Sequence, residues 1–169
     1  MAHSHKPACF RITFVCSGNI CRSPMAEVVL RALATQYRLS HRLLVESAGT
    51  ADWHVGEPAD QRTLAALRAA GYDGSAHRAK QFDVSQFVSS DLIVYFDNSH
   101  QRMLHALANG SGGQQKLQSL LSFDPGYAEL SEVPDPYYAD DETFERVLEV
   151  IEQCCRSLFR QLAPALQAA

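Results

Sequence analysis

The stretch Val15–Glu27, VCSGNICRSPMAE, contains the features that decide the fold of this chain. Cys16 follows FRITFV at residues 10–15, a run rich in β-branched and aromatic side chains that is typical of a buried strand. Small polar residues come next, and Ser23 and Pro24 then look like the N-cap and first residue of a helix. The stretch therefore predicts a strand, a tight loop and a helix in direct succession.

The same alternation continues along the chain. Further strands are expected at residues 43–47, 91–96 and 116–121, and further helices at residues 60–70, 83–89 and 98 or 99 to 107. An apolar stripe at helical spacing predicts a last helix from Asp141 to Leu162, with Pro164 just beyond it. Alternating strands and helices favour a single α/β domain, a four-stranded parallel sheet with helices on both faces.

Length and composition limit the possible functions. The 169 residues are 46% apolar, which suits one domain, expected to span residues 10–165 after a flexible N-terminus at residues 1–9. A net charge of -4 gives no support for a nucleic-acid partner. No apolar run is long enough for a membrane span or a signal peptide, so we expect a cytoplasmic protein that does not bind membranes. We also expect a monomer.

The cysteines are expected to be free thiols. Their number, five, is odd, and the sequence has no sign of secretion that would favour a disulfide framework. The spacing of the cysteines and of the scattered histidines differs from that of zinc-binding motifs. We therefore expect no metal and no other cofactor.

The loop after the first strand is suited to bind an anion. Ligands of parallel α/β sheets bind at the carboxyl ends of the strands, and a helix N-terminus there presents backbone N–H groups and a positive dipole. Gly18 and Asn19 readily adopt the left-handed conformations of a tight loop, and Arg22 adds a guanidinium that matches two phosphate oxygens. The loop predicts a site for phosphate or similar oxyanions.

Cys16 gives this loop a chemical role that simple anion sites lack. A cysteine beside a helix N-terminus and a cation is favoured as thiolate, the nucleophilic form of sulfur. Such a thiolate can accept a phosphoryl group, and Ser23 can donate a hydrogen bond to the sulfur. The alternative, a small buried hydrophobic residue at the end of a strand, suits an isolated cysteine better than this Cys-x5-Arg pattern. Cys21 is either a packed loop residue or the thiol that captures oxidised Cys16 as a disulfide.

At these residues the sequence resembles the low-molecular-weight protein tyrosine phosphatase family, whose motif matches CSGNICRSP at Cys16–Pro24. The resemblance covers nearly the whole chain after Phe10. It includes SAGT at residues 47–50, HRAKQ at 77–81, DNSH at 97–100 and DPYY at 135–138. It implies a sheet with flavodoxin-like winding, Cys16 as nucleophile, Arg22 as phosphate clamp and Asp135 as general acid.

The resemblance also implies how the loop keeps its shape. Asn19 is expected to hold it through hydrogen bonds that involve Ser23, Ser47 and His77. Lys80 stands where the family usually has arginine, which bears on local detail and leaves the implied reaction unchanged.

The residues themselves support Asp135 more weakly. An Asp between two prolines is most often a turn residue, and Asp124 is a competing acid in another loop. The reaction nevertheless requires one carboxyl group to protonate the departing phenolate and later to accept a proton from water. Asp135 is favoured largely because of the resemblance.

Aromatic residues are expected around the cleft. Tyr137 and Tyr138 are either core anchors or walls that admit a phenyl phosphate, and Trp53 either borders the cleft or closes the edge of the core. We expect substrate contacts from Ser17, Gly18, Asn19, Ile20, Cys21, Ser23, Trp53, Tyr137 and Tyr138.

The sequence thus predicts an enzyme that hydrolyses phosphotyrosine and aryl phosphates through a phosphocysteine, with tyrosine-phosphorylated proteins as partners. Arsenate reduction, a related activity on this scaffold, requires reducible cysteines on a mobile segment after the third strand. Cys154 and Cys155 lie in a predicted helix instead, so this activity is disfavoured. Binding of phosphoproteins without hydrolysis, or oxidant sensing by Cys16 and Cys21, is disfavoured because the residues needed for catalysis are present.

Overall fold

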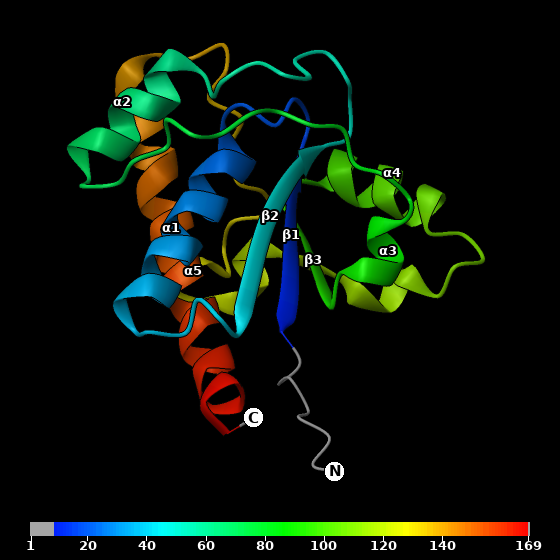
Figure 1. Cartoon of the computed structure of the whole chain (residues 1–169). Coiled ribbons are helices and arrows are strands. Elements are labelled where there is room, and N and C mark those ends of the chain that lie inside the picture. Colours follow the sequence, from blue (N-terminus) through cyan, green and yellow to red (C-terminus); the bar gives the residue numbers. More distant parts are fainter. Residues whose placement is uncertain (1–8, 169) are drawn as a thin grey trace.

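The computed structural model describes residues 9–168 and contains a four-stranded parallel sheet (Figure 1). The strands are β1 Phe10–Cys16, β2 Leu43–Gly49, β3 Leu92–Tyr95 and β4 Leu117–Ser119. Their order is β2-β1-β3-β4, and every neighbouring pair is parallel. This order confirms the predicted sheet and its flavodoxin-like winding.

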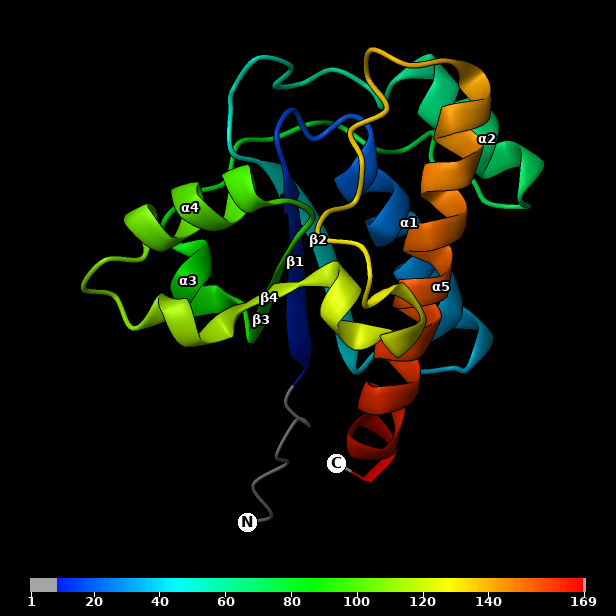
Figure 2. The ribbon, with the colours of Figure 1, turned by 180° about the vertical axis from the view of Figure 1, so that it is seen from behind.

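Helices cover both faces of the sheet, as the sequence predicts. They are α1 Arg22–Gln36, α2 Gln61–Ala69, α3 Gln86–Ser89, α4 Asn98–Leu107 and α5 Asp141–Ala168, with the 3-10 helices η1 Gly113–Lys116, η2 Leu120–Phe123 and η3 Pro125–Tyr127. Figures 1 and 2 show α1 and α5 on one face, with α2 beside the start of α5, and α3 and α4 on the other. The sheet is therefore the middle of three layers.

The side chains of β1 alternate between the two cores. Ile12, Phe14 and Cys16 pack into the cluster shared with α1 and α5, whereas Val15 packs into the cluster shared with α3 and α4. A central parallel strand with both faces covered is apolar on both sides, which explains the near-continuous apolar run in this part of the sequence. The alternation leaves Cys16 at the carboxyl end of β1, facing α1.

The first helix begins differently from the prediction. It starts at Arg22 with Cys21 in the N-cap position, so the assignment of Ser23 as N-cap is wrong. The Ser23 hydroxyl instead contacts the Cys16 sulfur and the Asn19 side chain. Pro24 remains within the first turn, where its missing N–H group has no intrahelical partner to lose.

The last helix is longer than predicted. It continues through Pro164 to Ala168, although proline was expected just beyond its end. Leu166, in the extra turn, is buried in the main hydrophobic cluster. Burial of this side chain offsets the hydrogen bond that Pro164 cannot make.

The expected N-terminal segment lies outside the described residues except for Cys9, and the predicted domain limits of 10–165 stay a prediction. Each helix within residues 9–168 is too short or too polar to cross a membrane.

Candidate active site

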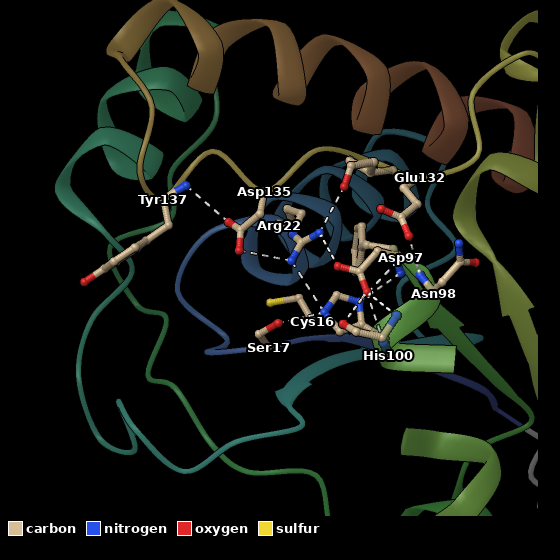
Figure 3. Close-up of polar contacts among 12 residues, drawn as sticks. Cys16, Ser17, Arg22, Asp97, Asn98, His100, Glu132, Asp135 and Tyr137 are labelled. Carbon is tan, nitrogen blue, oxygen red and sulfur yellow. Dashed lines mark hydrogen bonds and ion pairs between the residues drawn. The ribbon is translucent and has the colours of Figure 1, made fainter. Parts of the chain in front are cut away.

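A cavity of about 190 Å³ opens at the carboxyl end of β1, beside the point where the strand order reverses between β1 and β3. Figure 3 shows Cys16, Arg22 and Asp135 close together at this place. The cavity is lined by Cys16, Ser17, Gly18, Ile20, Cys21, Arg22, Trp53, His54, Asp135, Tyr137 and Tyr138. Two other predicted contact residues, Asn19 and Ser23, lie fully buried behind the loop.

The loop of residues 16–22, here named the phosphate loop, is held by Asn19. Its φ of 56° is left-handed, as the sequence predicts for a tight loop, whereas the φ of Gly18 is not. Its side-chain amide donates to Ser23 Oγ at 2.8 Å and to Ser47 Oγ at 2.9 Å, and its side-chain oxygen accepts from the Lys80 amide at 2.9 Å. His77 Nε2 donates to the Asn19 carbonyl at 2.7 Å. The expected partners of Asn19 are thereby confirmed, and Lys80 takes part through its backbone.

Glu27 orients the partners of Asn19 from the adjoining helix α1. Its carboxylate accepts a hydrogen bond from Ser47 and lies 3.7 Å from His77 Nδ1. Burial alone would raise the pKa of Glu27, but the nearby His77 and the hydrogen bond from Ser47 lower it below its ordinary value. The charged carboxylate directs the Ser47 hydroxyl hydrogen away from Asn19, so the Ser47 oxygen is free to accept from it.

The end of β2 supports the loop through the backbone. Thr50 donates its amide to the Cys16 carbonyl at 2.8 Å, and Ala51 donates to the Ser17 carbonyl at 3.0 Å. A Cβ atom on Gly49 would lie 2.6 Å from the Ser17 carbonyl oxygen, closer than such atoms approach. Glycine is therefore required at this position by the closeness of the two chains.

The Cys16 sulfur has a hydrogen-bond donor beside it. Ser23 Oγ lies 2.9 Å away, and the Asn19 amide already donates to that oxygen. The Ser23 hydrogen can therefore go to the sulfur or to the Ala48 carbonyl, which at 3.4 Å is the more distant acceptor. The start of α1 adds the positive end of a helix dipole. Both features place positive potential beside the sulfur.

Arg22 is held rigidly although it is a buried cation. Its side chain is 2% exposed, and its Nη1 donates to Asp97 Oδ2 and to the Val133 carbonyl, both at 2.9 Å. Its Nη2 lies 3.4 Å from Asp135 Oδ2 across the cavity (Figure 3). The ion pair with Asp97 compensates for removing the guanidinium from water.

Asp97 and His100 belong to the site, and our reasoning from the residues did not single them out. Burial alone would raise the pKa of Asp97, but hydrogen bonds from Ser99 and His100, and the charges of His100 and Arg22, lower it to about 2. The residue is therefore an anion that also caps α4. The sequence did contain a signal for these two residues. Asp97 and His100 have the spacing of a capping box, and they directly follow the third strand at the edge of the sheet where ligands bind.

His100 connects Asp97 with the phosphate loop. Its Nε2 lies 2.9 Å from Ser17 Oγ and 3.4 Å from Arg22 Nη2, and its Nδ1 lies 3.3 Å from the Asp97 amide. Burial, and then the charge of Arg22, lower the pKa of His100 to about 4. A neutral His100 therefore links Ser17 of the phosphate loop with Arg22 and with the start of α4.

Asp135 lies at the mouth of the cavity. Its side chain is 47% exposed, and its Oδ1 accepts from the Tyr137 amide at 3.1 Å. Asp124, the competing acid, is buried elsewhere and accepts from Ser157 Oγ at 2.7 Å. Only Asp135 of these two candidates faces the sulfur.

The aromatic residues form walls. Trp53 and Tyr138 are 70% and 95% exposed and Tyr137 is 36% exposed, which excludes the alternative that they anchor the core. The ring of His54, which our reasoning from the residues did not assign to the cleft, lies 6.2 Å from that of Tyr137. The cavity is thus flanked by rings that suit an aromatic leaving group.

The other cysteines differ chemically from Cys16. Cys21 lines the cavity, and burial, followed by the charge of Cys16, raises its pKa to about 12. Cys154 and Cys155 are buried in α5, and burial raises the pKa of both thiols. All are protonated at neutral pH, so they are poor nucleophiles for a thiol relay.

A cysteine at the start of such a loop, on a sheet of this winding, is the arrangement expected of the cysteine-dependent phosphatases. The family model "Low molecular weight phosphotyrosine protein phosphatase" matches residues 11–168, and this chain belongs to that family. It is therefore an enzyme, a cysteine-dependent protein-tyrosine phosphatase of low molecular weight.

Curated relatives and solved structures agree with this assignment. A low molecular weight protein-tyrosine-phosphatase of Streptomyces coelicolor is 46% identical over 150 residues, which cover 88% of this chain and 91% of that protein. The phosphotyrosine protein phosphatase of Sus scrofa is 37% identical over 152 residues, 89% of this chain and 94% of that protein. The crystal structure of YfkJ from Bacillus subtilis has a TM-score of 0.87 at 32% identity and covers 95% of this chain and 98% of that one.

Proposed function

We propose that this enzyme hydrolyses phosphotyrosine in proteins, and simple aryl phosphates, through a phosphocysteine on Cys16. Arg22 binds the phosphoryl oxygens and Asp135 is the general acid and base. The observation that carries the proposal is the cavity in which the Cys16 sulfur, the Arg22 guanidinium and the Asp135 carboxylate meet. Tyrosine-phosphorylated proteins are the expected substrates.

The first step transfers the phosphoryl group to sulfur. The Cys16 thiolate attacks phosphorus, an S–P bond forms, and the bond from phosphorus to the phenolic oxygen breaks. Asp135 gives its proton to the departing phenolate oxygen. Backbone N–H groups of the phosphate loop and the Arg22 guanidinium balance the charge on the three other oxygens.

The second step releases inorganic phosphate. A water molecule gives a proton to Asp135, its oxygen bonds to phosphorus, and the S–P bond breaks. The electron pair returns to the sulfur, which the Ser23 hydroxyl at 2.9 Å stabilises as thiolate. Asp135 then holds the proton needed for the next turnover.

A Cys16→Ser variant tests the nucleophile. We expect hydrolysis of p-nitrophenyl phosphate to fall by at least about 10⁴-fold, because a serine hydroxyl is far less acidic than a thiol. Because an inactive variant gives no rate from which to obtain an inhibition constant, phosphate binding to Cys16→Ser is measured by calorimetry. We expect this binding to be retained. Cys9→Ser, outside the site, is the matched control.

An acid-quenched reaction of the unmodified enzyme should contain a phosphorylated Cys16 peptide by mass spectrometry. Unaltered turnover in Cys16→Ser, or label on another residue, would contradict the proposed intermediate.

A further inference from the structure

Asp135 lies in residues 133–140, the last part of the connection between η3 and α5. This segment must be held in place if the acid is to reach the leaving group. We name it the acid segment. At its start, the Val133 carbonyl accepts from Arg22 at 2.9 Å, and the Val133 amide donates to the Phe96 carbonyl at 2.8 Å. Figure 2 shows its far end running past α2 before α5 begins. A side chain from α2 holds that end.

That side chain is Arg62. Its Nη2 donates to the Tyr137 carbonyl at 3.0 Å and its Nη1 to the Ala139 carbonyl at 3.1 Å. The guanidinium also lies over the Phe144 ring, 4.3 Å from its centroid, and 5.8 Å from that of Tyr137. Arg62 therefore contacts the acid segment through the carbonyls of Tyr137 and Ala139 and the Tyr137 ring, and it contacts the first turn of α5 through the Phe144 ring.

Asp60 fixes the direction of the Arg62 side chain. Its two carboxylate oxygens accept from Arg62 Nε at 3.0 Å and from Nη2 at 2.9 Å, and one of them also accepts from the Arg62 amide as the N-cap of α2. This forked geometry leaves little freedom to the guanidinium. Hydrogen bonding to Arg62 lowers the pKa of Asp60 despite its partial burial, so the pair is ionised at neutral pH.

The same pair also contacts the phosphate loop. The Asp60 amide donates to the Ile20 carbonyl at 2.9 Å. The start of α2 is thus bonded to the loop that holds the phosphate and, through Arg62, to the segment that holds the acid. These two parts of the site are more than one hundred residues apart in sequence, and their relative position decides whether Asp135 reaches the leaving oxygen.

We propose that Arg62, oriented by Asp60, is a positioning residue that sets the acid segment against the phosphate loop and thereby makes Asp135 effective as the general acid. The inference rests on the proposed function, since it concerns the acid assigned there. A role in acid catalysis has a signature that loss of stability lacks. Loss of a residue that supports acid catalysis lowers kcat/KM for substrates with poor leaving groups and leaves it unchanged for substrates whose leaving group needs no proton.

The test compares kcat/KM for phenyl phosphate and p-nitrophenyl phosphate in Arg62→Met, Asp135→Ala and the double variant. Methionine keeps an apolar contact with Phe144 but has none of the N–H donors of the Arg62 side chain. We expect Arg62→Met to lower kcat/KM for phenyl phosphate by about tenfold or more, and that for p-nitrophenyl phosphate by less than about twofold. In the Asp135→Ala background, Arg62→Met should add less than about a twofold further loss.

Controls separate positioning from general damage. Arg68→Met, at an exposed position of the same helix, should change neither rate. Asp60→Asn keeps an N-cap oxygen but weakens the fork, and should show the Arg62→Met pattern in weaker form. The inhibition constant of inorganic phosphate should stay within about twofold in Arg62→Met, because Arg22 and the phosphate loop are intact.

Equal losses for both substrates in Arg62→Met, or losses that multiply in the double variant, would overturn the positioning role while leaving the proposed function intact. If Asp135→Ala itself shows no dependence on the leaving group, Asp135 is not the acid, and the inference about Arg62 fails with it.

Discussion

The floor and the rim of the cavity are built in opposite ways. The floor, formed by Cys16, Asn19, Arg22 and Ser23, is buried, and its polar groups are bonded to one another. The rim, formed by Trp53, Tyr137 and Tyr138, consists of large side chains exposed to solvent. A buried network holds catalytic groups without reorganisation, whereas exposed rings can adapt to different phosphopeptides. Substitutions should therefore change the chemistry at the floor and substrate choice at the rim.

Arg22→Lys should have the largest effect. A lysine has a single nitrogen in place of the fork that bonds Asp97 and Val133 while facing the substrate. We expect kcat/KM for p-nitrophenyl phosphate to fall by about 10³-fold. Arg102→Lys, on the exposed side of α4, is the control for the loss of a guanidinium. A fall of less than tenfold would mean that the fork is dispensable.

Asn19→Ala should follow in size. It removes the side chain that bonds Ser23, Ser47 and the Lys80 amide, and it places alanine at a φ of 56°. We expect kcat/KM to fall by about 10²-fold and the free energy of unfolding by about 2–4 kcal/mol, because buried polar groups lose their partners. Enzyme assays and urea denaturation measure the two effects.

The exposed Asn109→Ala is the control for Asn19→Ala. Unchanged activity of Asn19→Ala together with lowered stability would show that the shape of the phosphate loop does not depend on Asn19.

His100 should make the stability of the floor depend on pH. Its folded pKa of about 4 lies below the ordinary value of 6.5, so the unfolded chain binds more protons between these values and stability falls as pH decreases. From about pH 7 to about pH 5, we expect this residue to reduce the free energy of unfolding by about 2 kcal/mol. Urea denaturation at both pH values should show that loss in the parent enzyme, and a smaller one in His100→Gln.

His41→Gln, at an exposed position, should keep the pH dependence of the parent enzyme. If the free energy of unfolding depends on pH in His100→Gln as it does in the parent enzyme, His100 is not the residue responsible for that dependence.

Trp53→Ala should have the smallest effect on the chemistry. The indole is 70% exposed and contributes to the wall of the cavity. We expect kcat/KM for p-nitrophenyl phosphate to change by less than about threefold, and that for a tyrosine-phosphorylated peptide to fall by about tenfold, since the larger substrate reaches the rim. Equal changes for both would show that rim and floor are not separable.

The sequence predicted those parts of the fold and of the site that depend on residues close together in the chain. Cys16, Gly18, Asn19 and Arg22 lie within one short loop, so strand, loop and helix could be inferred together. Ser23 was misassigned as an N-cap because its hydroxyl contacts the Cys16 sulfur and the Asn19 amide instead of a backbone N–H group of the helix. Local propensity does not decide between such partners.

The remaining parts depend on contacts between distant residues. His100 reaches Ser17, and Arg62 reaches Tyr137 and Ala139, only after the chain has folded. Pro164 stays helical because Leu166 is buried, a condition that residue type alone does not reveal. Patterns within single segments predicted the strands and the loop at Cys16, and packing supplied the residues that position that loop.

Trp53 is the single tryptophan of the chain, and its indole lies at the mouth of the cavity with most of its surface in solvent. Its fluorescence will therefore respond to an occupant of the site, and the emission maximum of the free enzyme will already be close to that of an indole in water. The enzyme thus carries an intrinsic optical reporter of ligand occupancy, which allows binding to be titrated without a label.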